Sequence, residues 1–322
     1  MLEHDGCVRM VMCSFCGRRE AVFVRAYSGE KLCRNCFCTS VEDRVRAAIA
    51  KYEMLKFDDK LLVAVSGGKD SVGLLHALAR IEKNFPKATL LAVSIDEGIK
   101  GYRDEALQIA AENCSFLSVE HHVSSFKELF GLSLDEIVQK AEKILNSERL
   151  STCAYCGVLR RRALDLAAKQ LNADVLALGH NLDDVVQTFL LNVVHGDVDR
   201  LARFGAVSAK SDVFVRRVRP FCLVPERETA FYAYLRGIRF QSVVCPYAGD
   251  ALRNDVRFWL NRLEQRHPGS LFTVLRSFEK IKTLMPLKEK EFYVCKKCGD
   301  PCTEGRDVCM VCDFLEKLGV LC

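Results

Sequence analysis

The chain has 322 residues, of which 49% are hydrophobic and 28% are charged, so it is long enough for about two domains with a buried core. It contains neither a run of about 20 apolar residues nor an N-terminal apolar segment shaped like a signal peptide, so we expect a cytoplasmic protein without a membrane partner. The formal net charge of +5 is only mildly basic, which permits a nucleic-acid partner but does not require one.

Cysteine dominates the first 40 residues. The 17 cysteines of the chain include the pairs Cys13-x2-Cys16 and Cys33-x2-Cys36, a spacing typical of a tetrahedral Cys₄ zinc site. Cys7 and Cys38 lie close enough in the sequence to leave the fourth ligand open. Reduced cysteines without a metal are the alternative, but the spacing predicts an N-terminal zinc module over residues 1–40.

The middle of the chain alternates between strand and helix patterns. Residues 41–56 predict a linking helix, and from Lys60 onward we predict strands at 61–65, 89–95, 116–120 and 174–178, with helices at 71–83, 102–113, 157–171 and 182–194 and helical stretches between 125 and 150. Strand-like stretches at 213–224 and 238–245 and helices at 251–266 and 270–283 follow. This alternation predicts an α/β domain over 41–285, built on a parallel sheet with helices on both faces.

Ligands of such sheets bind beyond the carboxyl ends of the strands, which points to the loops 66–71, 96–100 and 179–184. The first loop has the sequence Ser66-Gly67-Gly68-Lys69-Asp70-Ser71. Its glycines let backbone N–H groups converge on an anion, Lys69 adds a positive charge, and the serine hydroxyls can bond phosphate oxygens. The carboxylate of Asp70 suits Mg²⁺. The loop therefore predicts a nucleotide site, although it matches neither the Walker nor the dinucleotide-binding pattern.

Three further cysteines belong to neither terminal group. Cys153 and Cys156 are two residues apart before the predicted helix 157–171, and Cys245 stands alone before a proline. Three thiolates can hold an iron–sulfur cluster and leave one iron open, whereas a structural zinc site is closed by four ligands. A redox dithiol with an unrelated third cysteine is the alternative.

The chain ends with another paired set, Cys295-x2-Cys298 and Cys309-x2-Cys312, which predicts a C-terminal zinc module over residues 286–322. Cys302 is an additional candidate ligand within it. A module this small buries too little surface to fold unaided, so the metal would supply much of its folding free energy. We therefore expect two Zn²⁺ ions per chain.

The sequence Ser-Gly-Gly-Lys-Asp-Ser resembles the PP-loop of the ATP pyrophosphatase superfamily. Together with Gly179-His-Asn-Leu-Asp-Asp184, the three central cysteines and the two zinc modules, in this order, the whole chain resembles the TtuA family of tRNA 2-thiouridine synthetases, relatives of the cytosolic wobble-uridine thiolases. The resemblance implies a homodimer that binds tRNA, adenylates O2 of a T-loop or wobble uridine with ATP and Mg²⁺, and replaces that oxygen with sulfur. It also implies a 4Fe-4S cluster and a ubiquitin-like sulfur carrier protein as the donor.

The resemblance also assigns roles to residues. ATP-binding positions are Ser66, Gly67, Gly68, Lys69, Asp70, Ser71, Ile95, Arg160 and Gly179; catalytic positions are Lys69, Asp70 and Asp184; cluster ligands are Cys153, Cys156 and Cys245; and zinc ligands are Cys13, Cys16, Cys33, Cys36, Cys295, Cys298, Cys309 and Cys312. Asp184 also has a simpler interpretation, as a residue that favours the N-terminus of a helix.

Basic residues suggest where tRNA would bind. The candidates are Arg160, Arg161, Arg162, Arg200, Arg203, Lys210, Arg216, Arg217 and Arg219, although charged runs are commonly just solvated. Two other functions remain open. A cytidine thiolase of the TtcA type would use the three cysteines but not two zinc modules, and a zinc-ribbon nucleic-acid-binding or scaffold protein would carry a vestigial ATP loop.

Overall fold

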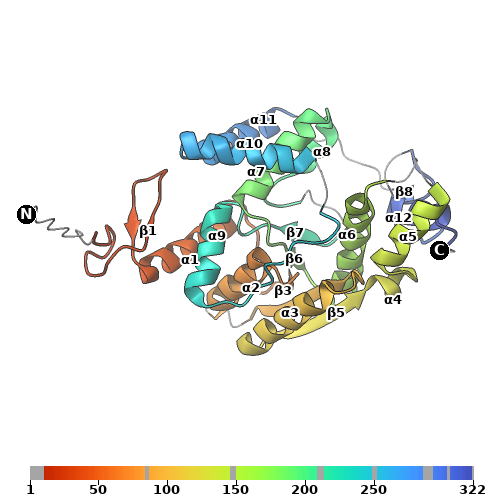
Figure 1. Ribbon diagram of the computed structural model, residues 1–322, viewed down its shortest axis with the longest axis horizontal. Coiled ribbons are helices and arrows are strands. Elements are labelled where there is room, and N and C mark those ends of the chain that lie inside the picture. Colours follow the sequence, from red (N-terminus) through yellow and green to blue (C-terminus); the bar gives the residue numbers. More distant parts are fainter. Residues whose placement is uncertain are drawn as a thin grey trace, which may run out of the picture.

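The computed structural model describes residues 11–83, 87–145, 150–208, 214–248, 252–285, 293–302 and 305–320. At its centre lies a parallel sheet with the order β5-β4-β3-β6-β7 (Figure 1). Its strands are β3 (Lys60–Ala64), β4 (Thr89–Asp96), β5 (Glu120–Ser125), β6 (Val175–Ala177) and β7 (Arg216–Val218). The predicted α/β class with a parallel sheet is confirmed.

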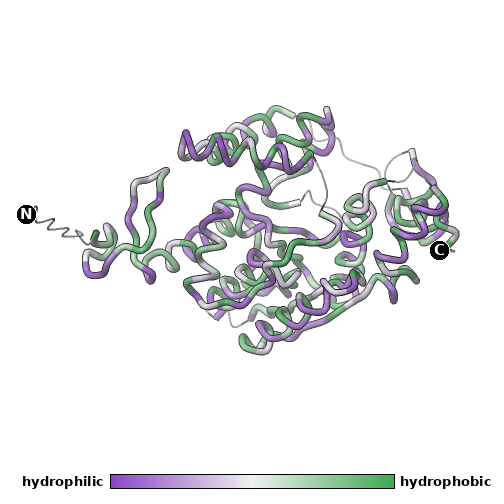
Figure 2. The backbone as a smooth tube through the Cα atoms, viewed as in Figure 1, coloured by the Kyte–Doolittle hydropathy of each residue, from purple (hydrophilic) through white to green (hydrophobic). Residues whose placement is uncertain are grey.

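Successive residues of β3 face opposite sides of the sheet, as the pleat requires. Leu61 and Val63 join one apolar cluster, while Leu62 joins another. The first cluster includes residues of α1 (Arg34–Lys51), α2 (Lys69–Glu82), α3 (Arg103–Leu117), α7 (Leu182–Val194), α9 (Glu226–Arg236) and α11 (Ser270–Leu284). The second includes residues of α4 (Phe126–Phe130), α5 (Leu134–Leu145) and α6 (Thr152–Gln170). Both faces are therefore buried, which explains the continuous apolar runs of the central strands. The helices carry both hydrophobic and hydrophilic residues, as Figure 2 shows.

A small two-stranded module lies at each end of the molecule (Figure 1). The N-terminal one pairs β1 (Phe23–Val24) with β2 (Lys31–Leu32) and continues directly into α1. The C-terminal one pairs β8 (Tyr293–Val294) with β9 (Pro301–Cys302) and ends in α12 (Met310–Lys317), whose apolar residues pack with those of α6. The two modules thus belong to the apolar clusters on opposite faces of the sheet.

Several predicted elements are displaced. The linking helix spans Arg34–Lys51 instead of 41–56, because it begins inside the N-terminal module directly after Cys33. The strand predicted at 116–120 is wrong: α3 continues to Leu117, and β5 follows only at Glu120, after Ser118 has turned the chain with a φ of 56°. Strand β5 is an edge strand with the polar sequence EHHVSS, so it carries little of the apolar signal that marks the central strands.

The region between β7 and the C-terminal helices also differs. Within 213–224 only Arg216–Val218 is a strand, with residue 213 outside the described part, and 238–245 contributes no strand but only an isolated bridge from Gln241 to Gly68. Helix α9 (Glu226–Arg236) lies where no element is assigned from the sequence, and α8 (Val198–Arg203) is likewise unpredicted. Helix α10 (Leu252–Arg266) and α11 confirm the last two predicted helices, apart from residue 251, which is not described. None of the described helices is long and apolar enough to cross a membrane.

Candidate functional site

The loop between β3 and α2 is shaped for an anion. Gly67 has a φ of +85°, and a Cβ at this position would clash with the backbone of Ala106. Helix α2 then begins at Lys69, so its first N–H groups lack intrahelical acceptors and point out of the helix. Within the loop, the Ser66 and Ser71 hydroxyls lie 3.0 Å apart, and the backbone N–H of Ser66 donates to Ser71 Oγ at 3.0 Å. Such an arrangement is suited to binding a phosphate group.

Gly179, from the loop after β6, packs against the start of α2. A Cβ on Gly179 would lie 3.0 Å from the backbone nitrogen of Ser71, so only glycine lets the two loops come this close. Asn181, in the same loop as Gly179, also contacts the start of α2: its side-chain amide donates to Asp70 Oδ1 at 3.2 Å. The structure therefore brings the first and third predicted loops together.

Asp70 and Lys69 are held by a helix that the sequence does not reveal. Thr229 Oγ1 of α9 donates to Asp70 Oδ1, and Glu226 Oε1 lies 2.9 Å from Lys69 Nζ. Lys69 also lies 2.6 Å from Asp70 Oδ2. Although desolvation disfavours the charged amine, Asp70 and Glu226 outweigh it and raise the pKa of Lys69. Arg257 of α10 reaches the same Glu226 carboxylate at 2.9 Å.

The two acidic residues that open α7 have different surroundings. Asp183 is 7% exposed and accepts a hydrogen bond from the Glu226 backbone N–H at 2.7 Å. Asp184 exchanges hydrogen bonds with Asn181 in a capping box, which is the simpler of its two predicted roles. Desolvation, with Asp70 next in effect, raises the pKa of Asp184 to about 6, so its carboxylate is also close enough to Asp70 to respond to its charge. Asp184 thus caps the helix and lies beside the nucleotide loop.

The second predicted loop, after β4, contributes a buried carboxylate. Arg103 donates to the backbone carbonyls of Ser66 at 2.9 Å and Ile95 at 2.6 Å, while its Nε lies 2.7 Å from Glu97 Oε2. Ile95 itself is 4% exposed, at the carboxyl-terminal part of β4. The other oxygen of Glu97 lies 2.6 Å from Arg160 Nε. Glu97 therefore bridges the phosphate loop and helix α6.

Arg160 points from α6 toward the central cysteines. Its Nη2 donates to Cys156 Sγ at 3.0 Å, so its described contacts are with Glu97 and Cys156. Cys153 and Cys156 lie in the first turns of α6, which begins at Thr152, so the prediction that this pair precedes the helix is wrong. The short polar N-cap, Ser151, accepts from the backbone N–H of Ala154 and explains this earlier start.

The three central thiols come together from two segments. Desolvation raises the pKa of Cys156 to about 11, with Arg160 opposing the shift, and both Cys245 and Cys153 contribute to the shift through their charge. Cys153 Sγ donates to the backbone oxygen of Tyr247 at 3.4 Å, which fixes the Cys245 segment beside α6. Among the described residues these three sulfurs are not gathered within 4.8 Å of one another, unlike the terminal sets.

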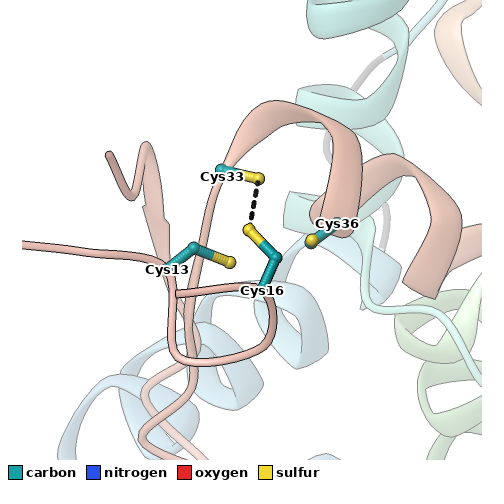
Figure 3. A group of neighbouring side chains, drawn as sticks. All are labelled: Cys13, Cys16, Cys33 and Cys36. Atoms are coloured by element: carbon teal, nitrogen blue, oxygen red, sulfur yellow. Dashed lines mark hydrogen bonds between the residues drawn. The ribbon is translucent and has the colours of Figure 1, made fainter. Parts of the chain in front are cut away.

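The two terminal cysteine sets are compact. Cys13, Cys16, Cys33 and Cys36 form one group, drawn in Figure 3, and Cys295, Cys298, Cys309 and Cys312 form the other, with all sulfurs of each group within 4.8 Å. The Cys16–Cys33 and Cys298–Cys309 sulfur distances of 3.9 and 3.7 Å match the roughly 3.8 Å expected between ligands of a tetrahedral zinc. Desolvation opposes ionisation of Cys13 and Cys295, but backbone N–H groups outweigh it and lower the pKa of each thiol to about 6.

The spare cysteines are outside these groups. Cys38 is a buried residue of α1 in the apolar core, and Cys302 donates to the Arg306 carbonyl at 3.0 Å. Cys7 lies outside the described residues. The described geometry therefore favours the four-ligand sets named from the spacing.

Sequence reasoning missed Glu97, Arg103, Glu226 and Thr229. Glu97 lies in a loop that the sequence does identify, but an acidic residue after a strand is too common to single out. Glu226 and Thr229 follow Pro225, which is a helix-start signal, yet nothing in the sequence indicates that α9 packs on the phosphate loop.

The comparisons with known proteins agree with this geometry. A family model described as a PP-loop domain matches residues 38–263. The tRNA 2-thiolation protein NcsA of Haloferax volcanii is 36% identical over 95% of this chain and 98% of its own length, and the cytoplasmic tRNA 2-thiolation protein 1 of Chlamydomonas reinhardtii is 36% identical over 95% and 85%. The solved U34-tRNA thiolase NcsA from Methanococcus maripaludis, with its [4Fe-4S] cluster, has a TM-score of 0.83 at 32% identity and covers 96% of this chain and 97% of its own. The chain therefore belongs to the PP-loop family of tRNA 2-thiolation proteins.

Proposed function

We propose that this chain is an ATP-dependent sulfurtransferase that converts a tRNA uridine to 2-thiouridine, and that the uridine is the wobble base. The solved relative is named a U34-tRNA thiolase, which supports the wobble position over the T-loop. The observation that carries the proposal is the series of contacts from the Ser66 carbonyl through Arg103, Glu97 and Arg160 to Cys156. Adenylation of O2 and delivery of sulfur to C2 must occur at one position of the pyrimidine, and these contacts hold the two sites together.

In the first step, uridine O2 attacks the α-phosphate of ATP and pyrophosphate leaves. The backbone cradle at residues 66–71 and the N-terminus of α2 would bind the phosphates, and Lys69 would neutralise the charge that develops on the leaving group. Asp70 would hold Mg²⁺. Because Lys69 Nζ lies against Asp70 in this structure, binding of Mg²⁺ and ATP would replace that ion pair with contacts from Lys69 to phosphate and from Asp70 to the metal.

Asp184 is proposed as the acid–base group of the site. Its pKa near 6 lets the carboxyl exchange a proton close to neutral pH, as general acid–base catalysis requires. Asn181 and Thr229 keep Asp70 oriented, so they are proposed as positioning residues. In the second step a sulfur nucleophile adds to C2 and AMP leaves with the original uridine oxygen.

Cys153, Cys156 and Cys245 are proposed as ligands of a 4Fe-4S cluster. Their number fits three thiolate ligands, and the guanidinium of Arg160 would stabilise the Cys156 thiolate. When bound, such a cluster supplies an iron with an open coordination position for sulfur. Ile95 and Gly179 are proposed to line the nucleotide pocket, which is consistent with their positions at the carboxyl ends of β4 and β6.

We further propose one Zn²⁺ in each Cys₄ set and a division into residues 1–40, 41–285 and 286–322, with the first boundary falling within helix α1. A homodimer, a ubiquitin-like sulfur carrier with a C-terminal thiocarboxylate, and a cytoplasmic location complete the proposal. The resemblance supports the first two, and the name of the Chlamydomonas relative supports the location.

The proposal is tested with anaerobically purified protein, ATP, Mg²⁺, unmodified tRNA and sulfide, followed by mass spectrometry of the nucleosides. We expect 2-thiouridine at position 34 with wild type and with the surface control Asp43→Asn, and none with Asp70→Asn. Thiocytidine would instead support a cytidine thiolase, and ATP consumption without any thiolated nucleoside would contradict the assignment.

A further inference from the structure

Arginines gather where the edge strand β7 meets helix α6. Arg217 lies within β7, and Arg219 directly follows the last residue of that strand. Arg217 reaches α6, where it binds Asp165 and donates to the Arg161 carbonyl at 3.4 Å. We call Arg161, Arg217 and Arg219 the arginine cluster.

The arginine cluster has one acidic partner among the described residues, Asp165, and it forms an ion pair with only one of the three arginines. Asp165 pairs with Arg217, whereas the exposed side chain of Arg161 forms no ion pair or hydrogen bond with any residue in the described part of the chain. Arg219 stacks over the Phe204 ring at 4.9 Å and donates from Nη1 to the Gly205 carbonyl at 2.5 Å, but its buried Nε finds no acceptor among the described residues. Two guanidinium groups therefore lack a counter-charge.

The cations of this region also destabilise one another. Desolvation, followed by the charge of Arg217, lowers the pKa of Arg219 to about 10. Desolvation, followed by the charges of Arg217 and Arg200, also lowers the pKa of Arg161. Desolvation, followed by Arg219, Arg253 and Arg217, lowers the pKa of His180 to about 3. An anion bound here would relieve this repulsion.

Several other basic candidates are already neutralised within the protein. Arg216 pairs with Asp59 at 2.9 Å, and Arg162 pairs with Asp300 of the C-terminal module. Arg160 pairs with Glu97, and Arg200 pairs with Asp197 at 3.0 Å. Lys210 lies outside the described residues. Arg203 has no ion pair among the described residues either, so the uncompensated charge of the candidates lies at Arg161, Arg203 and Arg219, of which Arg161 and Arg219 both lie near Arg217.

The cluster adjoins the catalytic loops without belonging to them. His180, whose pKa is lowered in part by Arg219 and Arg217, directly follows Gly179 of the nucleotide pocket. The charge of Asp70 raises the pKa of Asp184, and the charge of Asp184 in turn acts on Arg219. Arg161 is the next residue after Arg160, which contacts Cys156. An anion at the cluster would lie beside both halves of the proposed reaction site.

We propose that Arg161 and Arg219 form a subsite for the backbone phosphates of the polynucleotide substrate next to the reacting base. The planar fork of a guanidinium matches two phosphate oxygens, and the subsite would hold the nucleotide in register while its base faces the α-phosphate of ATP. This inference rests on the proposed function. The other source of phosphate is the leaving pyrophosphate, which the test separates from a nucleic-acid phosphate.

The test measures the dissociation constant of unmodified tRNA across a salt series for Arg161→Gln, Arg219→Gln and Arg219→Lys. Each Gln variant should weaken binding about fivefold at 0.15 M salt and reduce the slope of log K against log salt by about 1. Arg219→Lys keeps the charge and should retain the slope even if its packing on Phe204 changes. Arg46→Gln, an exposed arginine of α1 paired with Asp43, should match wild type. ATP affinity, measured in parallel, should stay unchanged in Arg161→Gln.

Unchanged tRNA affinity and slope in both Gln variants would overturn the proposal. If those variants kept tRNA affinity but lost inhibition by added pyrophosphate, the subsite would belong to the leaving group and the proposal would also be wrong. If wild type failed to bind tRNA at low salt, the proposed function itself would fail, whatever the variants do.

Discussion

Glu97 and Arg160 join the nucleotide loop to the thiol site, with Glu97 Oε1 2.6 Å from Arg160 Nε. Glu97 is 3% exposed, and its other oxygen pairs with Arg103, which holds the Ser66 carbonyl. Two loops and one helix thus depend on a single buried carboxylate.

Replacing Glu97 with Gln should therefore uncouple the two sites. A hydrogen bond to a charged group contributes roughly 1.5–3 kcal/mol, so we expect thiolation to fall about tenfold or more while ATP affinity changes little. Single-turnover thiolation and equilibrium ATP binding measure the two effects. Glu105→Gln, an exposed change on α3 whose carboxylate contacts Gln241, is the control. Equal losses of ATP binding and thiolation would argue against the bridging role.

Thr229 should matter for catalysis through Asp70, which accepts its hydroxyl hydrogen bond. Thr229→Val removes the bond but keeps the shape, so kcat/KM for ATP should fall about tenfold, whereas Thr229→Ser should retain most of the activity. Pyrophosphate release over a range of Mg²⁺ concentrations measures this. A Val variant with wild-type kinetics would show that Asp70 needs no support from α9.

The N-terminal module is fixed to α9 through Glu228, which is 1% exposed and binds Arg25 Nη2 at 2.7 Å and the Tyr27 hydroxyl. Breaking a buried pair of this kind costs about 3–5 kcal/mol, so Arg25→Met and Glu228→Gln should each lower the free energy of unfolding strongly, and their effects should not add. Urea denaturation of the two single variants and the double variant gives the coupling energy.

The exposed pair Arg239–Glu112, at 2.7 Å, is the matched control. Its coupling should be at most about 1 kcal/mol because both side chains are solvated. A Glu228 coupling no larger than that of the control pair would contradict the account.

Asp183 should make stability depend on pH. Desolvation raises the pKa of Asp183 to about 6 in the folded protein from its ordinary value of 3.8, so the folded state binds the proton more tightly than the unfolded state. The favourable contribution is present at low pH and is lost as the pH rises through 6. Between pH 5 and pH 7.5 the free energy of unfolding should therefore fall by about 1 kcal/mol. Asp183→Asn, whose amide oxygen can still accept from Glu226, should remove this loss, and a variant with an unchanged pH dependence would contradict it.

The central sheet and both cysteine modules could be predicted because their signals are local. Apolar runs mark β3, β4 and β6, and ligand spacing marks the Cys₄ sets. The phosphate loop is equally local, because its glycines, lysine and hydroxyls follow one another in the sequence. Strand β5 was predicted at the wrong residues because this polar edge strand lacks such a local apolar signal.

The residues that orient the site could not be predicted, because their contacts depend on tertiary packing. Thr229 lies 159 positions from Asp70, and Glu97 lies 63 positions from Arg160. Nothing in either local sequence distinguishes these residues from ordinary surface polar groups. Their roles follow only from which helix packs on which loop.

The claim that adenylation and sulfur delivery are separate functions of one site is tested most directly by Cys245→Ala. Pyrophosphate release and 2-thiouridine formation are measured in the same anaerobic reaction, with Cys114→Ala, a buried cysteine of α3 outside the site, as the control. We predict that Cys245→Ala loses iron and thiolation but retains tRNA-dependent pyrophosphate release and two zinc ions per chain. Full thiolation by the iron-free variant would contradict the account.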